Sequence, residues 1–454
     1  MGRLFGTDGI RGIANSYLTC ELALKVGRAA GSVLSDGSRR RLLFCVGSDT
    51  RISSDMLSFS IASGLCSVGV DVIILGVVPT PAVAYLVGKY KADAGIMISA
   101  SHNPAEYNGI KIFSGDGYKI PDALEEQIES IVLDDEAEQA LSGTDIGKVT
   151  YATNAIKDYV DHLKSTVMNS LEGLNIAVDC ANGSASVSAD KLFAALGANA
   201  DILHNKPDGI NINCDCGSTH IGLLREYVLN NKLDAGVAYD GDADRCICVD
   251  DKGNVIDGDF IMAICAKDMK ERGKLAKNTA VGTVMTNMGF GRFCKDNGIS
   301  FVATKVGDRF VLEEMLQEDY NFGGEQSGHV IFSDYASTGD GQLTSIQLLS
   351  LVKRSGKKLS ELAEVMKRYP QSIINVTVSK EGKLAFYTDP QIKTVIEDAK
   401  KQFGETGRIV VRPSGTEPLI RVMTEGEDRA LTENIAKRRV CPAGAVGGRY
   451  LFSG

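Results

Sequence analysis

Short β-branched runs, each followed by an amphipathic stretch, recur along most of this 454-residue chain. Alternation between strand-like and helix-like periods is typical of βα units, which build parallel or mixed sheets covered by helices. Residues 21–34 show the helical half of such a unit, because their apolar residues recur every three or four positions. The pattern predicts several α/β domains in series, with strands at LLFCV before Asp49, DVIIL at 71–75, AGIMI at 94–98, NIAVD at 175–179, AGVAY at 235–239, TAVGTV at 279–284 and FVAT at 301–304.

Four domains fit the length and the breaks in this pattern. Domains average about 150 residues, so the length allows three, or four if they are small. Charged, poorly patterned segments near 133–152, 250–258 and 366–370 are the predicted boundaries. The resulting domains are residues 1–152, 153–252, 253–366 and 367–454. The first three have the α/β pattern, and the last, with three strands around a helical 388–402, is predicted to be a smaller α+β domain.

Charge and hydropathy restrict the partners. The chain is 44% hydrophobic and 24% charged, which is typical of globular proteins. Its 49 basic and 58 acidic residues give a net charge of -9, which argues against nucleic-acid binding. The longest near-neutral stretch, 72–88, contains two prolines and is shorter than the about 20 apolar residues of a membrane span. Charges at the N-terminus replace the apolar run of a secretory signal, so we expect a cytoplasmic protein without membrane contact.

Eleven cysteines are spread along the chain, several of them in strand-like runs. An odd number in a cytoplasmic chain predicts reduced, buried thiols. The pairs Cys214/Cys216 and Cys246/Cys248 have no second pair and no histidine at zinc-ligand spacing. We therefore expect no zinc site at these pairs.

The common nucleotide-binding and hydrolase motifs are absent, and four compact polar stretches stand out instead. The first, ISASHNP at 98–104, follows a strand and holds Ser101 where α/β sheets place ligands. Ser101 is a candidate nucleophile, with an ordinary turn serine as the alternative. Its neighbour His102 is not expected to form a dyad with it, because adjacent side chains in an extended loop diverge. Lys111 reaches the same loop if the chain folds back as a hairpin.

The second stretch places Asp240, Asp242 and Asp244 in six residues after a strand. Three carboxylates buried this close repel one another by several kcal/mol unless a cation lies between them. Oxygen-only ligands suit Mg²⁺, whereas the calcium EF-hand fits poorly because Arg245 stands where its glycine is required. An acidic surface turn is the alternative.

The third and fourth stretches offer hydrogen-bonding groups for a sugar and for a phosphate. GGEQSGH at 323–329 presents Glu325, Ser327 and His329 before a strand, with a plain hairpin turn as the alternative. RPSGTEP at 412–418, with Arg421 beyond it, combines arginines, hydroxyls and a glycine into a candidate phosphate cradle. Together, the four stretches indicate phosphoryl transfer to or from a phosphosugar. Because no nucleotide site is evident, Ser101 is the candidate carrier of the phosphoryl group.

These motifs resemble those of the α-D-phosphohexomutase superfamily. The opening FGTDGIRG and the loop GGEQSGH are most similar to bacterial members that act on glucosamine phosphate, and GSDTR at 47–51, VDCANGSAS at 178–186, PDGININ at 207–213, KVGDRF at 305–310 and TGDGQ at 338–342 agree. The resemblance implies four domains around a central cleft, three of them related α/β domains with mixed sheets and the last a smaller phosphate-binding domain.

The resemblance also implies roles for individual residues. Ser101 would be carried as phosphoserine and would bind Mg²⁺ together with Asp240, Asp242 and Asp244. Arg11 and Arg245 would add positive charge beside it, and Lys111 and His102 would act as acid or base, with His329 as a third candidate. Glu325 and Ser327 would hold sugar hydroxyls, and the phosphate that does not react would be held by Arg412, Ser414, Gly415, Thr416 and Arg421.

The implied reaction interconverts glucosamine 6-phosphate and glucosamine 1-phosphate through glucosamine 1,6-bisphosphate, which also serves as the primer. The product would supply UDP-N-acetylglucosamine and cell-wall synthesis, and a homodimer is compatible with this interpretation. The same chemistry on glucose or mannose phosphates, a catalytically silent sugar-phosphate binder and a simple phosphatase are the alternatives. Gln326 in the sugar loop favours glucosamine over glucose or mannose.

The end of the chain departs from the family, because no helical pattern follows Arg439 and Pro442 and several glycines would stop a helix. The tail after about residue 436 is atypical, as in a frame-shifted or altered terminus, and we predict that it lowers the stability of the last domain before it affects chemistry. Thermal melting of this chain against one ending in a designed helix measures the difference. Equal midpoints would contradict the prediction.

Overall fold

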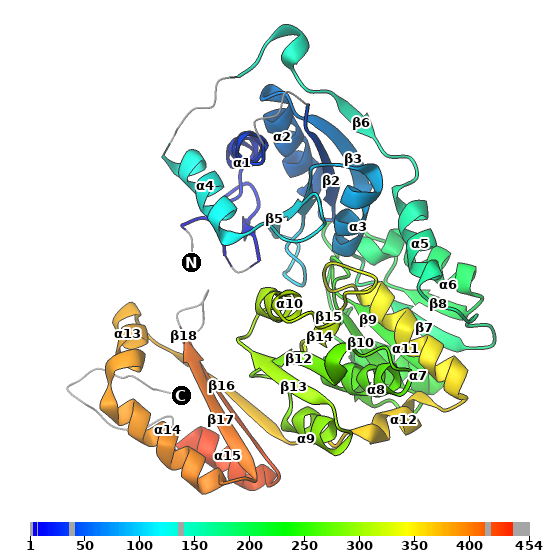
Figure 1. Ribbon diagram of the computed structural model, residues 1–454, viewed down its shortest axis with the longest axis vertical. Coiled ribbons are helices and arrows are strands. Elements are labelled where there is room, and N and C mark those ends of the chain that lie inside the picture. The colour runs from blue at the N-terminus through cyan, green and yellow to red at the C-terminus, as the bar shows by residue number, and fades with distance from the viewer. Residues whose placement is uncertain (1–2, 7, 36–40, 135–139, 414–418, 439–454) are drawn as a thin grey trace. The chain divides into compact units, whose positions relative to one another are not determined.

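The computed structural model describes residues 3–6, 8–35, 41–134, 140–413 and 419–438. The chain divides into two compact units, residues 1–283 with 304–364, and residues 284–303 with 365–454 (Figure 1). Four sheets are present within the described residues, three mixed and one antiparallel. The atypical tail lies outside the described residues, so its predicted effect stays a prediction.

The first sheet has the strand order β1-β5-β4-β2-β3-β6. Its strands are β1 (Ile10–Ile13), β2 (Leu43–Ser48), β3 (Asp71–Val77), β4 (Ala94–Ile98), β5 (Tyr107–Ser114) and β6 (Val149–Tyr151), and its helices are α1 (Cys20–Val33), α2 (Ser54–Ser67), α3 (Thr80–Tyr90) and α4 (Asp122–Leu133). Side chains of both faces are buried, with α1 and α2 packed on one face and α3 approaching the other at Gly47 and Gly95 (Figure 1). Burial on both faces explains the nearly continuous apolar runs of these strands.

The second sheet has the order β11-β10-β9-β7-β8 and the third the order β13-β12-β14-β15. The second is built from β7 (Asn175–Asp179), β8 (Asn199–Leu203), β9 (Ala235–Tyr239), β10 (Cys246–Asp250), β11 (Val255–Ile256), α5 (Ala155–Ser165), α6 (Ala189–Leu196) and α7 (Gly222–Asn231). The third is built from β12 (Thr279–Thr283), β13 (Ser300–Thr304), β14 (Phe322–Gly324), β15 (Val330–Phe332), α8 (Gly258–Glu271), α10 (Asp308–Gln317), α11 (Gly341–Ser355) and α12 (Leu359–Leu362). Short 3₁₀ turns lie at Gly143–Asp145, Ser184–Val187, Ala276–Asn278 and Ala363–Val365.

The second unit contains a three-stranded antiparallel sheet of order β16-β18-β17. Its elements are β16 (Gln371–Thr377), β17 (Gly407–Pro413), β18 (Leu419–Gly426), α13 (Lys380–Thr388), α14 (Pro390–Phe403), α15 (Arg429–Arg438) and α9 (Met288–Asp296). One face of this sheet buries Val376, Ile420 and Val422 against Phe403 and Ile435 of the helices. Because side chains alternate along a strand, Asn375, Arg412 and Arg421 belong to the opposite face.

The three mixed sheets repeat one strand order, β3-β2-β4-β5 in the first, β8-β7-β9-β10 in the second and β13-β12-β14-β15 in the third. In each, the third strand of this set runs parallel to its inner neighbour and the fourth returns antiparallel. Three of the four polar stretches fill the loop between those two strands. The predicted α/β class with a smaller C-terminal domain is confirmed, while the predicted boundaries and central cleft stay predictions.

The described cysteines are all free thiols, and most are buried, as expected. Among the helices that the structure describes, none is long and apolar enough to cross a membrane.

Helices α1 and α2 cross at two glycines. A Cβ on Gly27 would lie 2.5 Å from the Ile61 carbonyl oxygen, and one on Gly64 would overlap the Leu24 carbonyl oxygen. Backbone neighbours cannot yield as a flexible side chain can, so the crossing depends on both residues lacking a Cβ. The stripe of apolar residues predicted for 21–34 faces this crossing, with Val26, Ala29 and Ala30 fully buried.

We predict that Gly64→Ala destabilises the first domain by about 1–3 kcal/mol through overpacking. Gly88→Ala is the matched control, because Gly88 lies in helix α3 and a Cβ there would meet no described residue within 4 Å outside its own helix. Alanine there should be neutral or stabilising by up to about 1 kcal/mol. Urea unfolding of the full chain measures both changes, and equal midpoints for the two variants would contradict the prediction.

Candidate active site

Ser101 lies directly beyond β4, buried and with a left-handed backbone (φ 52°). This conformation is uncommon for a residue with a Cβ and is concentrated at functional sites. The hydroxyl donates to Oδ2 of Asp240 at 2.6 Å, and the backbone N–H donates to the hydroxyl of Ser99 at 3.0 Å. The predicted nucleophile and the first predicted metal ligand therefore share a hydrogen bond across two domains.

His102 also contacts Ser101, with Nδ1 3.2 Å from Oγ. The expectation that these neighbours diverge is wrong, because the left-handed turn at Ser101 replaces the extended loop that the expectation assumed. The single hydroxyl proton is donated to Asp240, so Nδ1 of His102 is the donor in the second contact. Burial, followed by the charges of Arg245 and Arg11, lowers the pKa of His102 to about 4. The imidazole is therefore neutral at neutral pH.

Arg51, which no motif assigned to the site, holds the Ser101 loop in place. Its guanidinium donates to the carbonyl oxygens of Ser101 at 3.0 Å and Asn103 at 2.8 Å, and also to that of Pro104. The side chain is fully buried and forms an ion pair with Asp49 at 2.9 Å. A sequence signal for this role lies in the motif GSDTR, in which Arg51 stands two residues after Asp49, just beyond a strand.

Asp240, Asp242 and Asp244 come together in the turn between β9 and β10, where Ala243 takes a positive φ of 58°. Each offers a carboxylate oxygen within 4.8 Å of the others, and all three are buried. Burial, and then the charges of Asp244 and Asp242, raises the pKa of Asp240 well above its usual range. Oδ1 of Asp242 and Oδ1 of Asp244 are buried without a hydrogen bond from any described residue. Unpaired buried carboxylate oxygens of this kind fit a divalent cation.

Lys111 faces the same carboxylates from β5, which pairs antiparallel with β4 as the predicted hairpin requires. Its ammonium lies 2.9 Å from Asp242, 3.1 Å from Asp8 and 3.5 Å from Asp244. Burial opposes its charge, but these carboxylates outweigh burial and raise the pKa of Lys111. Asp8 was not predicted as a site residue, although it lies in the motif FGTDGIRG.

The two predicted arginines lie at the edge of this charge cluster. Arg11 of β1 forms an ion pair with Asp8, and Nε of Arg245 lies 3.8 Å from Oδ1 of Asp244. Burial opposes the charge of Arg245, but Asp244 and Asp240 raise its pKa. Both guanidinium groups retain a buried Nε without a hydrogen bond from the described residues.

The GGEQSGH loop of the third domain approaches the three aspartates through His329. Its Nδ1 lies 3.7 Å from Asp244, and its Nε2 accepts the Gly339 amide at 3.1 Å. Oε1 of Glu325 accepts the Gly307 amide at 3.1 Å, and burial raises the pKa of Glu325. The Ser327 hydroxyl is buried and has no hydrogen-bond partner among the described residues.

Lys119 and Asp308 join the first and third domains, and neither was predicted. Lys119 forms ion pairs with Asp8 and with Asp308, the first residue of α10. Asp308 also lies 3.8 Å from Nε2 of His329. Asp308 could have been identified as a site residue from its place in the motif KVGDRF, whereas no sequence motif pointed to Lys119.

The second unit carries the predicted phosphate residues. Arg412 and Arg421 are directly opposite each other on β17 and β18, and Asn375 is opposite Arg421 on β16. These three side chains line a pocket of about 210 Å³. Ser414, Gly415 and Thr416 lie outside the described residues.

Comparison with known proteins agrees with this architecture. The phosphoglucomutase/phosphomannomutase family descriptions match in four parts, α/β/α domain I at residues 2–139, domain II at 157–253, domain III at 257–369 and the C-terminal domain at 373–440. The phosphoglucosamine mutase of Clostridium botulinum (strain Kyoto / Type A2) is 52% identical over 96% of this chain and 97% of its own.

Two solved structures share the fold. A phosphoglucomutase/phosphomannomutase family protein from Burkholderia thailandensis aligns with a TM-score of 0.80 at 23% identity, covering 96% of each chain. The N-acetylphosphoglucosamine mutase of Aspergillus fumigatus, solved with GlcNAc-6P and magnesium, aligns with a TM-score of 0.65 at 16% identity, over 97% of this chain and 95% of that one.

The four family matches and the phosphoglucosamine mutase relative identify an isomerase of the phosphohexomutase class. The chain belongs to the phosphoglucomutase/phosphomannomutase family. The family assignment leaves the role of each site residue a prediction.

We predict that Asp240→Asn raises the thermal stability of the protein in EDTA, because removing one charge relieves the repulsion among three buried carboxylates. Addition of Mg²⁺ should then stabilise the unaltered protein by about 1–3 kcal/mol and the variant much less, because the cation binds only the folded state. Thermal melts with and without Mg²⁺ measure both effects. Asp161→Asn, at an exposed ion pair with Lys157, is the control and should respond to Mg²⁺ as the unaltered protein does. An equal response of the Asp240→Asn variant would contradict the assignment.

Proposed function

We propose that this protein interconverts glucosamine 6-phosphate and glucosamine 1-phosphate, with Ser101 carrying the phosphoryl group. The observation that supports this most directly is the contact of the Ser101 hydroxyl with Asp240, 2.6 Å away in a group of three buried carboxylates. A hydroxyl in that position can carry a phosphoryl group whose negative charge a divalent cation held by these carboxylates would offset. The 52% identity to a phosphoglucosamine mutase over nearly the whole chain supports glucosamine as the sugar.

The proposed transfer has two balanced halves. In the first, the 1-hydroxyl of glucosamine 6-phosphate attacks the phosphorus on Ser101, so the bond to Oγ breaks, a bond to O1 forms and the hydroxyl proton leaves O1. In the second, Oγ attacks the phosphorus on O6 of the resulting 1,6-bisphosphate, and a proton returns to O6. Glucosamine 1-phosphate leaves and phospho-Ser101 is restored, which is why the 1,6-bisphosphate also serves as the primer.

Proton transfer to and from the sugar oxygens requires a nearby acid and base. His102 and Lys111 are the proposed carriers, because His102 touches Oγ and Lys111 touches the carboxylates beside it. His329, 3.7 Å from Asp244, is the third candidate. Arg11 and Arg245 are proposed to stabilise the negative charge of the phosphoserine.

Asp240, Asp242 and Asp244, together with the Ser101 phosphate, would hold Mg²⁺. The orphaned oxygens of Asp242 and Asp244 and the all-oxygen ligand set fit this ion. When bound, Mg²⁺ would offset charge on the transferring phosphoryl group. Arg51 would keep the carrier in place by holding three carbonyl oxygens of its loop.

Glu325 and Ser327 are proposed to bind the sugar. The Ser327 hydroxyl has no partner among the described residues and is available to a sugar hydroxyl. The carboxylate of Glu325 favours a sugar that carries an ammonium group at C2, as glucosamine does. Gln326 supports glucosamine as the substrate less than the sequence suggested, because its side-chain amide donates a hydrogen bond to Asp259 at 3.0 Å. The glucose and mannose phosphates therefore remain the competing substrates.

The phosphate that does not react would bind in the second unit. Arg412 and Arg421 lie directly opposite each other on neighbouring strands, so their two positive charges favour an anion beside them. Ser414, Gly415 and Thr416 of the adjoining loop are proposed to share this phosphate. Binding by several donors suits a substrate that presents its 1- and 6-phosphates in turn.

In the cell, the product would enter the synthesis of UDP-N-acetylglucosamine. The chain has no membrane-spanning helix among its described residues, and we propose that it acts in a bacterial cytoplasm on a small phosphosugar, alone or as a homodimer.

The first test is phosphorus NMR of glucosamine 6-phosphate with the protein, Mg²⁺ and a trace of the 1,6-bisphosphate. Glucose and mannose 6-phosphates are run in parallel. We expect a 1-phosphate signal that grows fastest from glucosamine. Faster conversion of glucose or mannose would change the substrate and keep the mechanism, and net release of inorganic phosphate would indicate a phosphatase.

Ser101→Ala is the matched control, because it removes only the hydroxyl. It should lose conversion by about 1000-fold or more while keeping part of the Mg²⁺-dependent rise in melting temperature, because the three carboxylates remain when the phosphate ligand is lost. Conversion by this variant at the unaltered rate would overturn Ser101 as the carrier. Absence of conversion by folded, Ser101-phosphorylated protein would favour the silent binder.

A further inference from the structure

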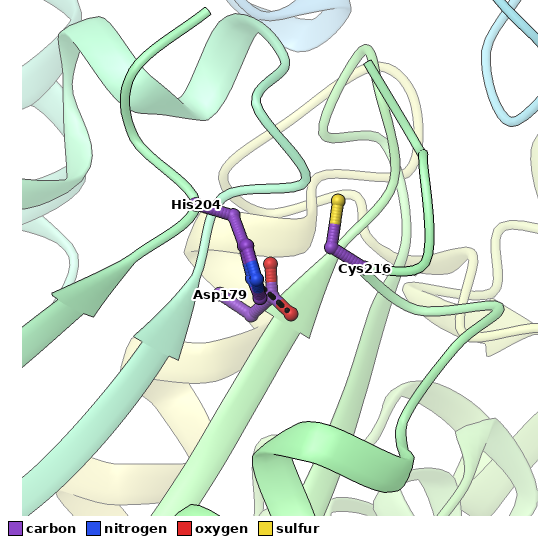
Figure 2. A group of neighbouring side chains, drawn as sticks. All are labelled: Asp179, His204 and Cys216. Carbon is purple, nitrogen blue, oxygen red and sulfur yellow. Dashed lines mark ion pairs between the residues drawn. The ribbon is translucent and has the colours of Figure 1, made fainter. Parts of the chain in front are cut away.

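A second group of possible metal ligands lies in the second domain, apart from the three aspartates. Asp179 is the last residue of β7, His204 directly follows β8, and Cys216 lies in the loop before α7. Figure 2 shows the three side chains together, with an ion pair joining His204 to Asp179. Each offers a ligand atom within 4.8 Å of the others.

The spacing of these atoms is close to that of a tetrahedral site. Nδ1 of His204 lies 3.0 Å from Oδ2 of Asp179, with which it forms an ion pair. Ligands about 2.0 Å from a zinc ion are about 3.3 Å apart at the corners of a tetrahedron. The nitrogen and the carboxylate oxygen therefore already lie close to one edge, and the Cys216 sulfur, within 4.8 Å of both, has to move closer to complete a face.

The carboxylate is held rigidly in this position. Oδ1 of Asp179 accepts the Ala181 amide at 2.9 Å, and Oδ2 accepts the Gly217 amide at 3.0 Å. Because Gly217 directly follows Cys216, the second bond also fixes the backbone that carries the thiol. His204 is constrained as well, since its backbone has a positive φ of 45°. Preorganised ligands of this kind lower the conformational entropy cost of binding an ion.

The burial of these side chains and the presence of a thiol favour one kind of ion. Asp179 and Cys216 are fully buried, and the His204 side chain is 29% exposed, which leaves a route from solvent. A cation that binds sulfur would stabilise the Cys216 thiolate in this buried position.

We propose that Asp179, His204 and Cys216 form a site for Zn²⁺ or a similar borderline-soft divalent ion. The sequence predicts no zinc site at Cys214/Cys216, because the other two ligands of this group lie outside the usual zinc-ligand spacing and only the fold brings them to Cys216. One carboxylate and one thiolate neutralise the two charges of the ion, a neutral imidazole supplies the third ligand, and water completes the tetrahedron. Binding releases the thiol proton. Mg²⁺ prefers oxygen ligands, so the chain would separate the two kinds of ion between this site and the three aspartates.

The site is connected to the active-site loops by hydrogen bonds. Asn213, three residues before Cys216, donates its backbone N–H to the Ala181 carbonyl oxygen at 2.9 Å and its side-chain amide to the Ser101 carbonyl oxygen at 2.9 Å. The Ser184 amide donates to the Gly241 carbonyl oxygen at 2.8 Å. An ion that orders residues 179–217 would therefore also stiffen the loops of Ser101 and the three aspartates. This inference is independent of which sugar the protein uses.

Cobalt titration tests the proposal on the full chain, with Mg²⁺ in excess to occupy the oxygen site. Co²⁺ replaces Zn²⁺ in such sites, and its bond to a thiolate gives a near-ultraviolet charge-transfer band that a carboxylate site does not give. We expect one Co²⁺ per chain with this band, displaced by Zn²⁺. No band at saturating Co²⁺, with the protein folded and its thiols reduced, would overturn the proposal.

The chain offers a matched pair of cysteine variants. Cys216→Ser should abolish the band, whereas Cys214→Ser, at an exposed thiol two residues away, should retain it. His204→Gln, at a partly exposed side chain, should keep the fold by circular dichroism and weaken Co²⁺ binding at least 10-fold. A band that survives Cys216→Ser, disappears in Cys214→Ser or is unchanged by His204→Gln would exclude this ligand set.

Discussion

The buried contact between Lys111 and the carboxylates around it is the interaction on which the active site depends. An ammonium 2.9 Å from Asp242 and 3.1 Å from Asp8 links the segment before β1, strand β5 and the turn after β9, so it joins two domains. Removing one partner of a buried ion pair costs several kcal/mol, because the remaining charge stays buried. Lys119 extends the alternation of charge to Asp308 of the third domain. These ion pairs thus join residues of three domains around Ser101. The three aspartates of this group can still bind a divalent cation.

Repetition of one sheet explains how a single reaction draws on residues so far apart. The loop between the third and fourth strands of the shared order carries Ser101 in the first domain, the aspartates in the second and Glu325 to His329 in the third. The same position in the sheet therefore presents the proposed carrier, the proposed metal ligands and the proposed sugar-binding residues.

Much of this site was predictable from the sequence, because its residues stand in short motifs beside strongly apolar strands. Asp240, Asp242 and Asp244 share six positions, so their mutual repulsion could be argued without coordinates. Lys111 followed from the hairpin. Arg51, Lys119 and Asp308 were not predicted, since their roles depend on carbonyl oxygens and carboxylates that lie far away in the chain. The relation between Ser101 and His102 was predicted wrongly, because a left-handed backbone at a serine leaves no signal in composition or spacing.

The sequence alone determined the α/β class, the smaller last domain and the residue types that we propose for transfer and binding of a phosphoryl group. These properties depend on local periodicity and on residues within a few positions of one another. The tertiary structure decided which groups meet, because contacts between strand ends belong to the sheet order and not to chain distance. Asp179, His204 and Cys216 illustrate the difference, since the sequence predicts none of them as a metal ligand and only the parallel pairing of β7 and β8 places the aspartate and the histidine side by side.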